Sequence, residues 1–239
     1  MFGSYQKGGC DTLNYIYIRC MKVLLQLVNL GEEAIEGLKE SFNKLPQTEH
    51  KDGKYRLRRY SAIELRTSFW NAKVEAEIER LSHHGFTQSE EFNKHQGGVT
   101  RDFEEIDDSV LHSEGMKAIC LAFKECRGLI DGQKIEIHQM RVLTQEDGIA
   151  KVAPEGVHQD GFDDIAMVGV NRYKIYGGQL LAYETYGSTP FLIHVLKNGE
   201  MLMLDDSKLW HNASPIVAES IEEAGYGDWF VLCAKRDGS

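Results

Sequence analysis

The chain has 239 residues, of which 42% are hydrophobic and 27% charged, a composition typical of a globular protein rather than a disordered one. This length is sufficient for one substantial domain or two small ones, and we predict a single domain over residues 1–239. The formal net charge of −10 argues against a nucleic-acid-binding or anionic-membrane-binding protein, because both classes need a basic surface.

The cysteines indicate a reducing, cytoplasmic environment, because the five of them are odd in number and show no Cys-x-x-Cys spacing. The most apolar stretch, residues 13–30, is interrupted by Arg19 and Lys22, so it offers no run of roughly twenty apolar residues to span a membrane. It also lacks the pattern of a signal peptide. Residues 1–20 either belong to the fold or form a dispensable extension, with Met21 as an alternative start.

Three helices are expected in the first half of the chain. Apolar residues recur at helical spacing over residues 32–45, 71–83 and about 109–127. Between the first two, Arg56-Leu57-Arg58-Arg59-Tyr60 is the densest basic cluster; it is short and flanked by apolar residues, which favours a strand edge or an anion contact. Each helical stripe is most simply explained by packing against a sheet.

From residue 134 onward the pattern changes to short β-rich runs separated by turn residues. We predict strands at residues 134–143, 165–172, 179–184, 191–196, 200–204 and 229–235. Asn198-Gly199 between two of these runs predicts a tight hairpin. Many short strands at this spacing indicate a sandwich or barrel.

Two short segments of this half carry residues suited to metal binding. His158-Gln159-Asp160 and His211 together supply two imidazoles and a carboxylate, the set that holds a ferrous ion on one face. In an extended segment, residues i and i+2 point to the same side, so His158 and Asp160 can share one metal. The alternative is a hydrogen-bonded loop pair with His211 as an ordinary half-buried histidine. A jelly roll would bring the two segments together, with residues 134–236 as the metal-binding β-helix core and helices buttressing one face.

Several spaced motifs, in the same order, resemble the iron- and 2-oxoglutarate-dependent dioxygenase family that includes bacterial free amino-acid hydroxylases such as isoleucine dioxygenase. The resemblance covers about residues 45–236 and rests on Arg58-Arg59-Tyr60, Gly97-Gly98-Val99-Thr100-Arg101, Ile137-His138-Gln139-Met140-Arg141, His158-Gln159-Asp160, Val170-Asn171-Arg172 leading to Gly177-Gly178, and Trp210-His211-Asn212-Ala213-Ser214-Pro215. It implies a mainly β fold, a double-stranded β-helix (cupin-like jelly roll). It also implies that His158, Asp160 and His211 bind Fe(2+), with 2-oxoglutarate as co-substrate and O2 as oxidant.

One position departs from the family pattern. Relatives generally carry an arginine at the start of the last strand, where it binds the distal carboxylate of 2-oxoglutarate; this chain has Gly227 there, followed by Asp228. Arg141 is our first candidate for a replacement and Arg172 the second, because a guanidinium can hold a carboxylate bidentately. The alternative for either arginine is a structural ion pair. Loss of the anchor would otherwise mean weak co-substrate binding, a different co-substrate or an inactive protein.

The expected activity is hydroxylation of a carbon of a free amino acid or similar small molecule. Arg59 or Arg101 is expected to bind the substrate carboxylate, and Asn212 and Ser214 are candidates for orienting the imidazoles. No catalytic side chain beyond the metal ligands is assigned, because the cofactor carries the oxidative chemistry. A non-catalytic cupin-like binding protein and a peptide- or protein-modifying oxygenase remain as alternatives. Neither a nucleic acid nor a membrane is expected as partner, and the oligomeric state stays open.

Overall fold

The computed structural model describes residues 23–70, 73–90, 95 and 97–236. The possible extension at residues 1–20, with Cys10 and Cys20, lies outside the described residues. The single-domain assignment over residues 1–239 therefore stays a prediction. No helix in the described ranges is long and apolar enough to cross a membrane.

A large antiparallel sheet forms the centre of the molecule. Within the described residues it has the strand order β1-β10-β6-β13-β4-β2-β3. In chain order, these strands are β1 (Leu25–Asn29), β2 (Arg56–Trp70), β3 (Lys73–Arg80), β4 (Gln133–Leu143), β6 (Asp164–Tyr173), β10 (Glu200–Asp205) and β13 (Tyr226–Ala234).

Two smaller sheets lie over one face of the large sheet and complete a jelly roll. One has the order β11-β8-β9, and the other has the order β5-β12-β7. Their strands are β5 (Ile149–Ala150), β7 (Ile175–Gly177), β8 (Leu180–Tyr183), β9 (Leu192–His194), β11 (Trp210–Ala213) and β12 (Ile216–Ala218). The predicted double-stranded β-helix with flanking helices is thus confirmed.

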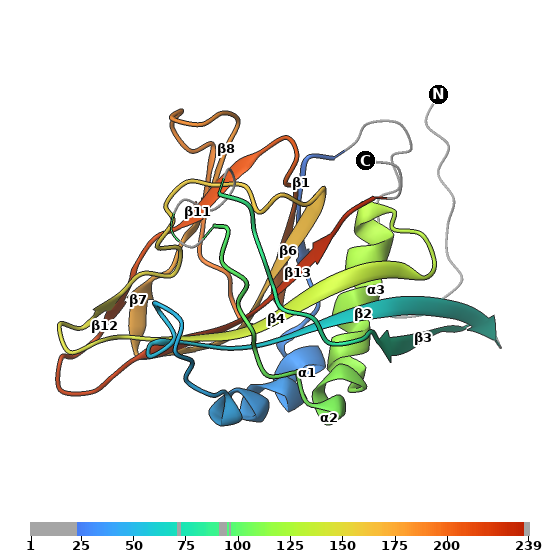
Figure 1. Cartoon of the computed structure of the whole chain (residues 1–239), viewed down its shortest axis with the longest axis horizontal. Coiled ribbons are helices and arrows are strands. Elements are labelled where there is room, and N and C mark those ends of the chain that lie inside the picture. Colours follow the sequence, from blue (N-terminus) through green and yellow to red (C-terminus); the bar gives the residue numbers. More distant parts are fainter. Residues whose placement is uncertain (1–22, 71–72, 91–94, 96, 237–239) are drawn as a thin grey trace.

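Helices cover the opposite face of the large sheet. They are α1 (Glu32–Ile35), the 3-10 helix η1 (Glu36–Lys44), α2 (Asp108–Leu111) and α3 (Glu114–Arg127). Figure 1 shows α1 and α2 below strands β2 and β4, with β8 and β11 above them. The predicted helix at 32–45 is present as α1 and η1. The one at 109–127 is split at Ser113, whose hydroxyl accepts a hydrogen bond from the Met116 amide and caps α3.

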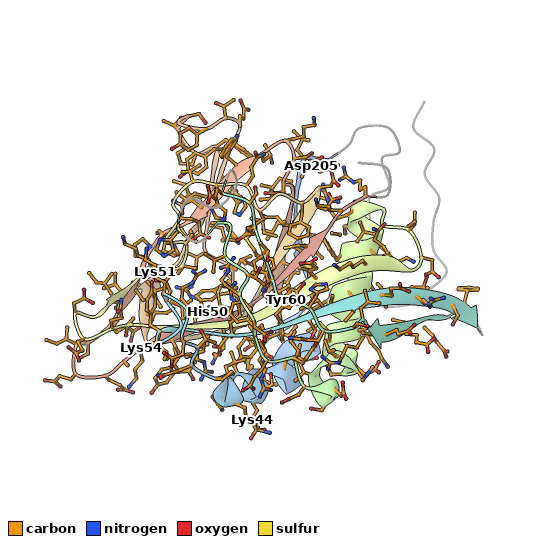
Figure 2. The ribbon with its side chains drawn as sticks, viewed as in Figure 1. Lys44, His50, Lys51, Lys54, Tyr60 and Asp205 are labelled. Atoms are coloured by element: carbon orange, nitrogen blue, oxygen red, sulfur yellow. The ribbon has the colours of Figure 1, made fainter. Side chains whose placement is uncertain are left out.

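Alternation along each central strand divides the interior into two cores. Phe230 and Leu232 of β13 pack with the helices, whereas Trp229 points to the other face and packs with residues of the smaller sheets. Side chains fill the space on both sides of the sheet, as Figure 2 shows, and Tyr60 of β2 is 1% exposed. The second core encloses the site described below.

The predicted helix at 71–83 is wrong, because residues 73–80 form strand β3. Val74, Ala76 and Ile78 alternate with glutamates at period two, and β3 pairs with β2 along that register. Ile78 is 3% exposed and Val74 49% exposed, so one face of this edge strand is only weakly buried. The apolar spacing of the segment is therefore compatible with a helix and with a strand. Pairing with the long strand β2 stabilises the strand.

The hairpin predicted at Asn198-Gly199 is also wrong. The turn is present, with Gly199 at φ +82° and the Glu200 amide donating to the Lys197 carbonyl. However, β9 before it pairs with β8, whereas β10 after it pairs with β1 and β6. The turn therefore carries the chain from a small sheet to the large one.

Candidate active site

A backbone bridge brings the two metal-binding motifs together. His158 lies in an extended loop segment outside the named strands, and His211 lies on β11. The His158 amide donates to the His211 carbonyl at 2.9 Å, and the His211 amide donates to the His158 carbonyl at 3.0 Å. Residues about fifty positions apart thus become direct neighbours.

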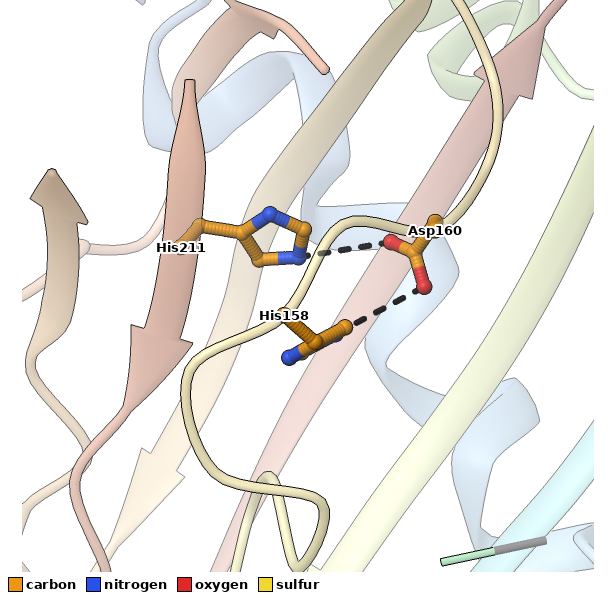
Figure 3. Close-up of side chains that lie close together, drawn as sticks. All are labelled: His158, Asp160 and His211. Atoms are coloured by element: carbon orange, nitrogen blue, oxygen red, sulfur yellow. Dashed lines mark ion pairs between the residues drawn. The ribbon is translucent and has the colours of Figure 1, made fainter. Parts of the chain in front are cut away.

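Three side chains converge at this bridge (Figure 3). One ligand atom from each of His158, Asp160 and His211 lies within 4.8 Å of the others. Nε2 of His158 is 3.6 Å from Oδ1 of Asp160, and Nε2 of His211 is 3.3 Å from Oδ2. Gln159 turns away, and its amide donates to the Asp206 carbonyl at 2.5 Å. Two imidazoles and one carboxylate aimed at one point fit a ferrous ion, so these residues form a candidate iron site.

Neighbouring groups orient both imidazoles. Nδ1 of His158 is 2.8 Å from the Gly156 carbonyl, which leaves Nε2 for a metal. Nδ1 of His211 lies 3.4 Å from Oδ1 of the fully buried Asp206, which is an ion-pair contact rather than a hydrogen bond. The second oxygen of Asp206 accepts the amides of residues 160–162 and so holds the loop that carries Asp160.

The residues expected to orient the imidazoles do not do so. The side-chain oxygen of Asn212 accepts the Ala213 amide, and the Ser214 hydroxyl donates to Gln179. Asp206 was missed because its spacing from His211 follows no fixed motif. Gln88 was missed for the same reason; its amide donates to Oδ1 of Asp160 at 2.9 Å.

The cluster has strong internal electrostatics. Burial raises the pKa of Asp160, but His158 and His211 outweigh burial and hold the pKa well below its usual range. Burial lowers the pKa of His211, yet Asp160 and Asp206 outweigh it and raise the pKa to about 10. The carboxylates therefore favour a positive charge at this point, which a divalent cation supplies when it binds.

A cavity of about 100 Å³ opens from the candidate iron site. Its wall includes apolar side chains such as Met140 and Trp229, together with three arginines, Arg56, Arg58 and Arg101. Of the two arginines expected at the substrate, only Arg101 lines this cavity. Arg59 lies outside it, and its guanidinium pairs with Glu104 at 3.2 Å and Asp107 at 2.6 Å. Arg56 and Arg58 were missed, although their period-two spacing on a strand was a usable signal.

Arg141, the first candidate for the co-substrate anchor, lies on the helix face of the sheet. It binds the buried Asp228 carboxylate through two nitrogens at 2.6 and 2.8 Å and donates to Asn43 of η1 at 3.0 Å. Its guanidinium also stacks 3.9 Å above the Tyr226 ring. The structure does not bring Arg141 to the cavity; it forms the structural ion pair that was the alternative.

Arg172, the second candidate, lies on the cavity side of β6, but it is not among the residues that line the cavity. It is the cross-strand partner of Gly227, at which the family pattern places an arginine. One terminal nitrogen donates to the Gly177 carbonyl at 2.7 Å, while the buried Nη1 has no hydrogen-bond partner in the part of the chain that the structure describes. Nη1 also lies 3.2 Å from where a Cβ at Gly178, in the cavity wall, would stand. Burial lowers the pKa of Arg172.

Comparisons with known proteins agree with this geometry. A bsmA homolog from Methylobium petroleophilum is 25% identical, with a TM-score of 0.69 over 86% of this chain and 82% of that one. IDO from Bacillus thuringiensis is 14% identical, with a TM-score of 0.68 over 90% and 91%, and the Fe(II)/α-ketoglutarate-dependent dioxygenase TqaL is 13% identical, with a TM-score of 0.63 over 90% and 83%. The latter two similarities concern the fold alone. No curated protein matches the sequence. The family model described as 2OG-Fe dioxygenase matches residues 39–233, and the chain therefore belongs to that family.

Proposed function

We propose that this dioxygenase, which uses Fe(2+), 2-oxoglutarate and O2, hydroxylates a carbon of a free amino acid or a similar small molecule. The observation that carries the proposal is the small cavity beside His158, Asp160 and His211, whose wall combines apolar side chains with arginines. The cavity of about 100 Å³ suits a small molecule, whereas a polypeptide would have to use the larger hollow of about 720 Å³ that adjoins it at Phe86, Gln88 and Asp160.

In this proposal His158, Asp160 and His211 hold the iron. Gly156 and Asp206 fix the two imidazoles, and Gln88 fixes the Asp160 carboxylate. The bound iron and 2-oxoglutarate supply the oxidising chemistry that inserts oxygen into a C–H bond. The chain itself positions the substrate and excludes water through Phe86, Met140 and Trp229 of the cavity wall. No side-chain nucleophile or general base is needed.

Arg172 is our proposed partner for the distal carboxylate of 2-oxoglutarate. Three observations support it: its position opposite Gly227, its buried Nη1 without a hydrogen-bond partner, and its proximity to Gly178. A buried guanidinium without a carboxylate is costly, and a bound anion would remove that cost. The Arg141 guanidinium, in contrast, is already paired with the Asp228 carboxylate and is not free to bind another one.

A cytoplasmic location is part of the proposal. Cys120, Cys126 and Cys233 are free thiols, which suits a reducing compartment. Burial raises the pKa of each of the three, so none is a reactive thiolate at neutral pH.

The test is 2-oxoglutarate turnover by the iron-loaded protein, followed as succinate and carbon dioxide, with and without a pool of free amino acids. Stimulation by the pool, with a hydroxylated amino acid as product, supports the proposal. His211→Ala is the matched inactive control. Turnover stimulated only by peptides would favour a protein-modifying oxygenase. Binding of 2-oxoglutarate with no turnover under any condition would favour a non-catalytic binding protein.

A further inference from the structure

Two arginines of the cavity wall have no carboxylate partner among the described residues. Arg101 is 4% exposed; it donates to the Gln88 side-chain oxygen at 2.8 Å and stacks 4.9 Å above the Phe86 ring. Arg58 is partly buried; it contacts the sulfur of Met140 at 3.2 Å and stacks 5.4 Å above the Phe103 ring. Both guanidinium groups are thus positioned by neutral side chains.

The surroundings of Arg58 and Arg101 also disfavour the charged form of each guanidinium group. Burial, together with the neighbouring charges of Arg56 and Arg101, lowers the pKa of Arg58 to about 9. Burial and Arg56 likewise lower the pKa of Arg101. A fold that keeps two desolvated cations in the wall of one cavity favours an anion that compensates them.

The formal charges of the residues around the cavity indicate the sign of the charge that a complementary ligand would carry. Asp160 belongs to the candidate iron site, and Arg56 lies 3.7 Å from the carboxylate of Asp52. Arg58, Arg101 and Glu155 remain in the wall, with a combined charge of +1. The carboxylate of Glu155 is 3.4 Å from Nε2 of His158, so it lies at the cavity end beside the iron site.

We infer that the substrate is a small acidic amino acid of net charge −1, whose two carboxylates bind Arg58 and Arg101 and whose ammonium group binds Glu155. This inference rests on the proposed function and narrows its substrate class. Each charged group of such a molecule meets one opposite charge of the wall. A neutral amino acid would leave one guanidinium uncompensated, and its binding would be weaker for that reason.

The test uses two pairs of probes that differ in charge and hardly in size: L-aspartate against L-asparagine, and L-glutamate against L-glutamine. Binding is measured by calorimetry to the protein loaded with Fe(2+) and 2-oxoglutarate under anaerobic conditions, so that no turnover occurs. We expect the acid of at least one pair to bind at least about tenfold more tightly than its amide.

Variants assign the effect to the two arginines. Arg58→Met and Arg101→Met should each weaken binding of that acid by about tenfold to a hundredfold while leaving 2-oxoglutarate binding unchanged. Arg58→Lys should retain part of the affinity. Arg59→Met is the matched control, because Arg59 is the next residue on the same strand but lies outside the cavity and is held by Glu104 and Asp107.

Equal or absent binding of acid and amide in both pairs would overturn the inference. So would a loss of 2-oxoglutarate affinity in Arg58→Met and Arg101→Met, since the arginines would then be the co-substrate anchor. Different results would reject the proposed function and the inference about the substrate. Arginine-dependent binding of the acid without succinate formation in air would leave the anion site standing and reject the hydroxylase. Turnover of a neutral amino acid would keep the hydroxylase and reject this inference.

Discussion

Arg172 and Gly227 face each other across the β6–β13 ladder, and a Cβ at Gly227 would lie 2.0 Å from Cη2 of Trp229. The indole ring therefore fills the space that an arginine side chain at position 227 would occupy. The neighbouring strand supplies a guanidinium on the same face instead.

This relationship predicts that Arg172→Met weakens binding of 2-oxoglutarate by about tenfold to a hundredfold, the loss of about 1.5–3 kcal/mol expected for a charged hydrogen bond. Iron binding should be unchanged, because Arg172 is not part of the candidate iron site. Calorimetry with the iron-loaded protein measures both. Arg172→Lys should fall between wild type and Arg172→Met. Wild-type affinity in Arg172→Met would rule out the anchor.

Gly227→Ala should destabilise the protein by about 1–3 kcal/mol, because the new methyl group overlaps the Trp229 ring and forces it to move. For the same reason, Gly227→Arg alone does not re-create the missing anchor. Gly37→Ala is the control: that glycine has nothing within 4 Å of its Cβ position, so its substitution should be neutral or slightly stabilising. Urea unfolding measures both, and equal stabilities would contradict the steric account.

The candidate iron ligands and the proposed co-substrate anchor differ in how far the sequence alone could predict their positions. The spacing of His158 and Asp160 is local, since i and i+2 share a side in any extended segment. The side on which Arg172 lies depends on a bulge opposite Asp228 and Trp229, which shifts the register of β6 by one residue. The sequence also could not show that Arg141 pairs with Asp228 on the helix face, because no local pattern states which face of the sheet borders the cavity.

The alternation of Arg56 and Arg58 and a strand at this cluster were visible in the sequence, but the length of the strand and its place between β4 and β3 were not. β2 runs for 15 residues through a segment in which charged residues interrupt the apolar pattern. Its pairing with β4 on one side and β3 on the other supplies the stability that its own sequence lacks. The same pairing made a strand of residues 73–80, for which the helical period was the wrong choice.

Asp206→Asn should lower affinity for Fe(2+) by about tenfold to a hundredfold, the usual effect of removing a carboxylate behind a metal-binding histidine. The substitution weakens both the contact with His211 and the acceptor for the amides of residues 160–162. Asn212→Ala is the control, because Asn212 adjoins His211 in sequence but bonds the Ala213 amide. Anaerobic metal titration provides the measurement, and matching affinities in the two variants would exclude a role for Asp206.

Asp131 lies outside the candidate active site, and its lowered pKa predicts that the stability of the protein depends on pH. Lys124 and then Thr67 lower its pKa from 3.8 to about 2 by hydrogen bonding. Because the pKa is depressed in the folded state, the stabilisation is present above about pH 4 and is lost as the pH falls toward 2. Asp131→Asn should therefore lower the melting temperature at pH 6, and the difference from wild type should narrow at pH 3. A constant difference across this range would contradict the assignment.

The arginines of the cavity predict a trade-off between binding and stability. Without ligand, Arg101 holds a buried charge with no carboxylate partner among the residues that the structure describes, so Arg101→Met should stabilise the free protein, by about 0.5–2 kcal/mol. Arg58→Met should change stability in the same direction. Arg127→Met is the contrasting control, because Arg127 pairs with the fully buried Asp164 at 2.6 Å. Breaking that pair removes one of the two arginines on the buried Asp164 carboxylate, the other being Arg236, and should therefore destabilise the protein.

Urea unfolding without and with the acidic probe measures the trade-off. The probe should stabilise wild type by mass action and should stabilise Arg101→Met far less. The difference in unfolding free energy between Arg101→Met and wild type should therefore shrink or change sign when the probe is added. If Arg101→Met were destabilised as strongly as Arg127→Met, Arg101 would be a structural residue with a partner in the fold. If Arg101 binds the ligand, Arg101→Met should make the free protein more stable and bind the probe more weakly. If Arg101 is a structural residue, the substitution should not make the free protein more stable.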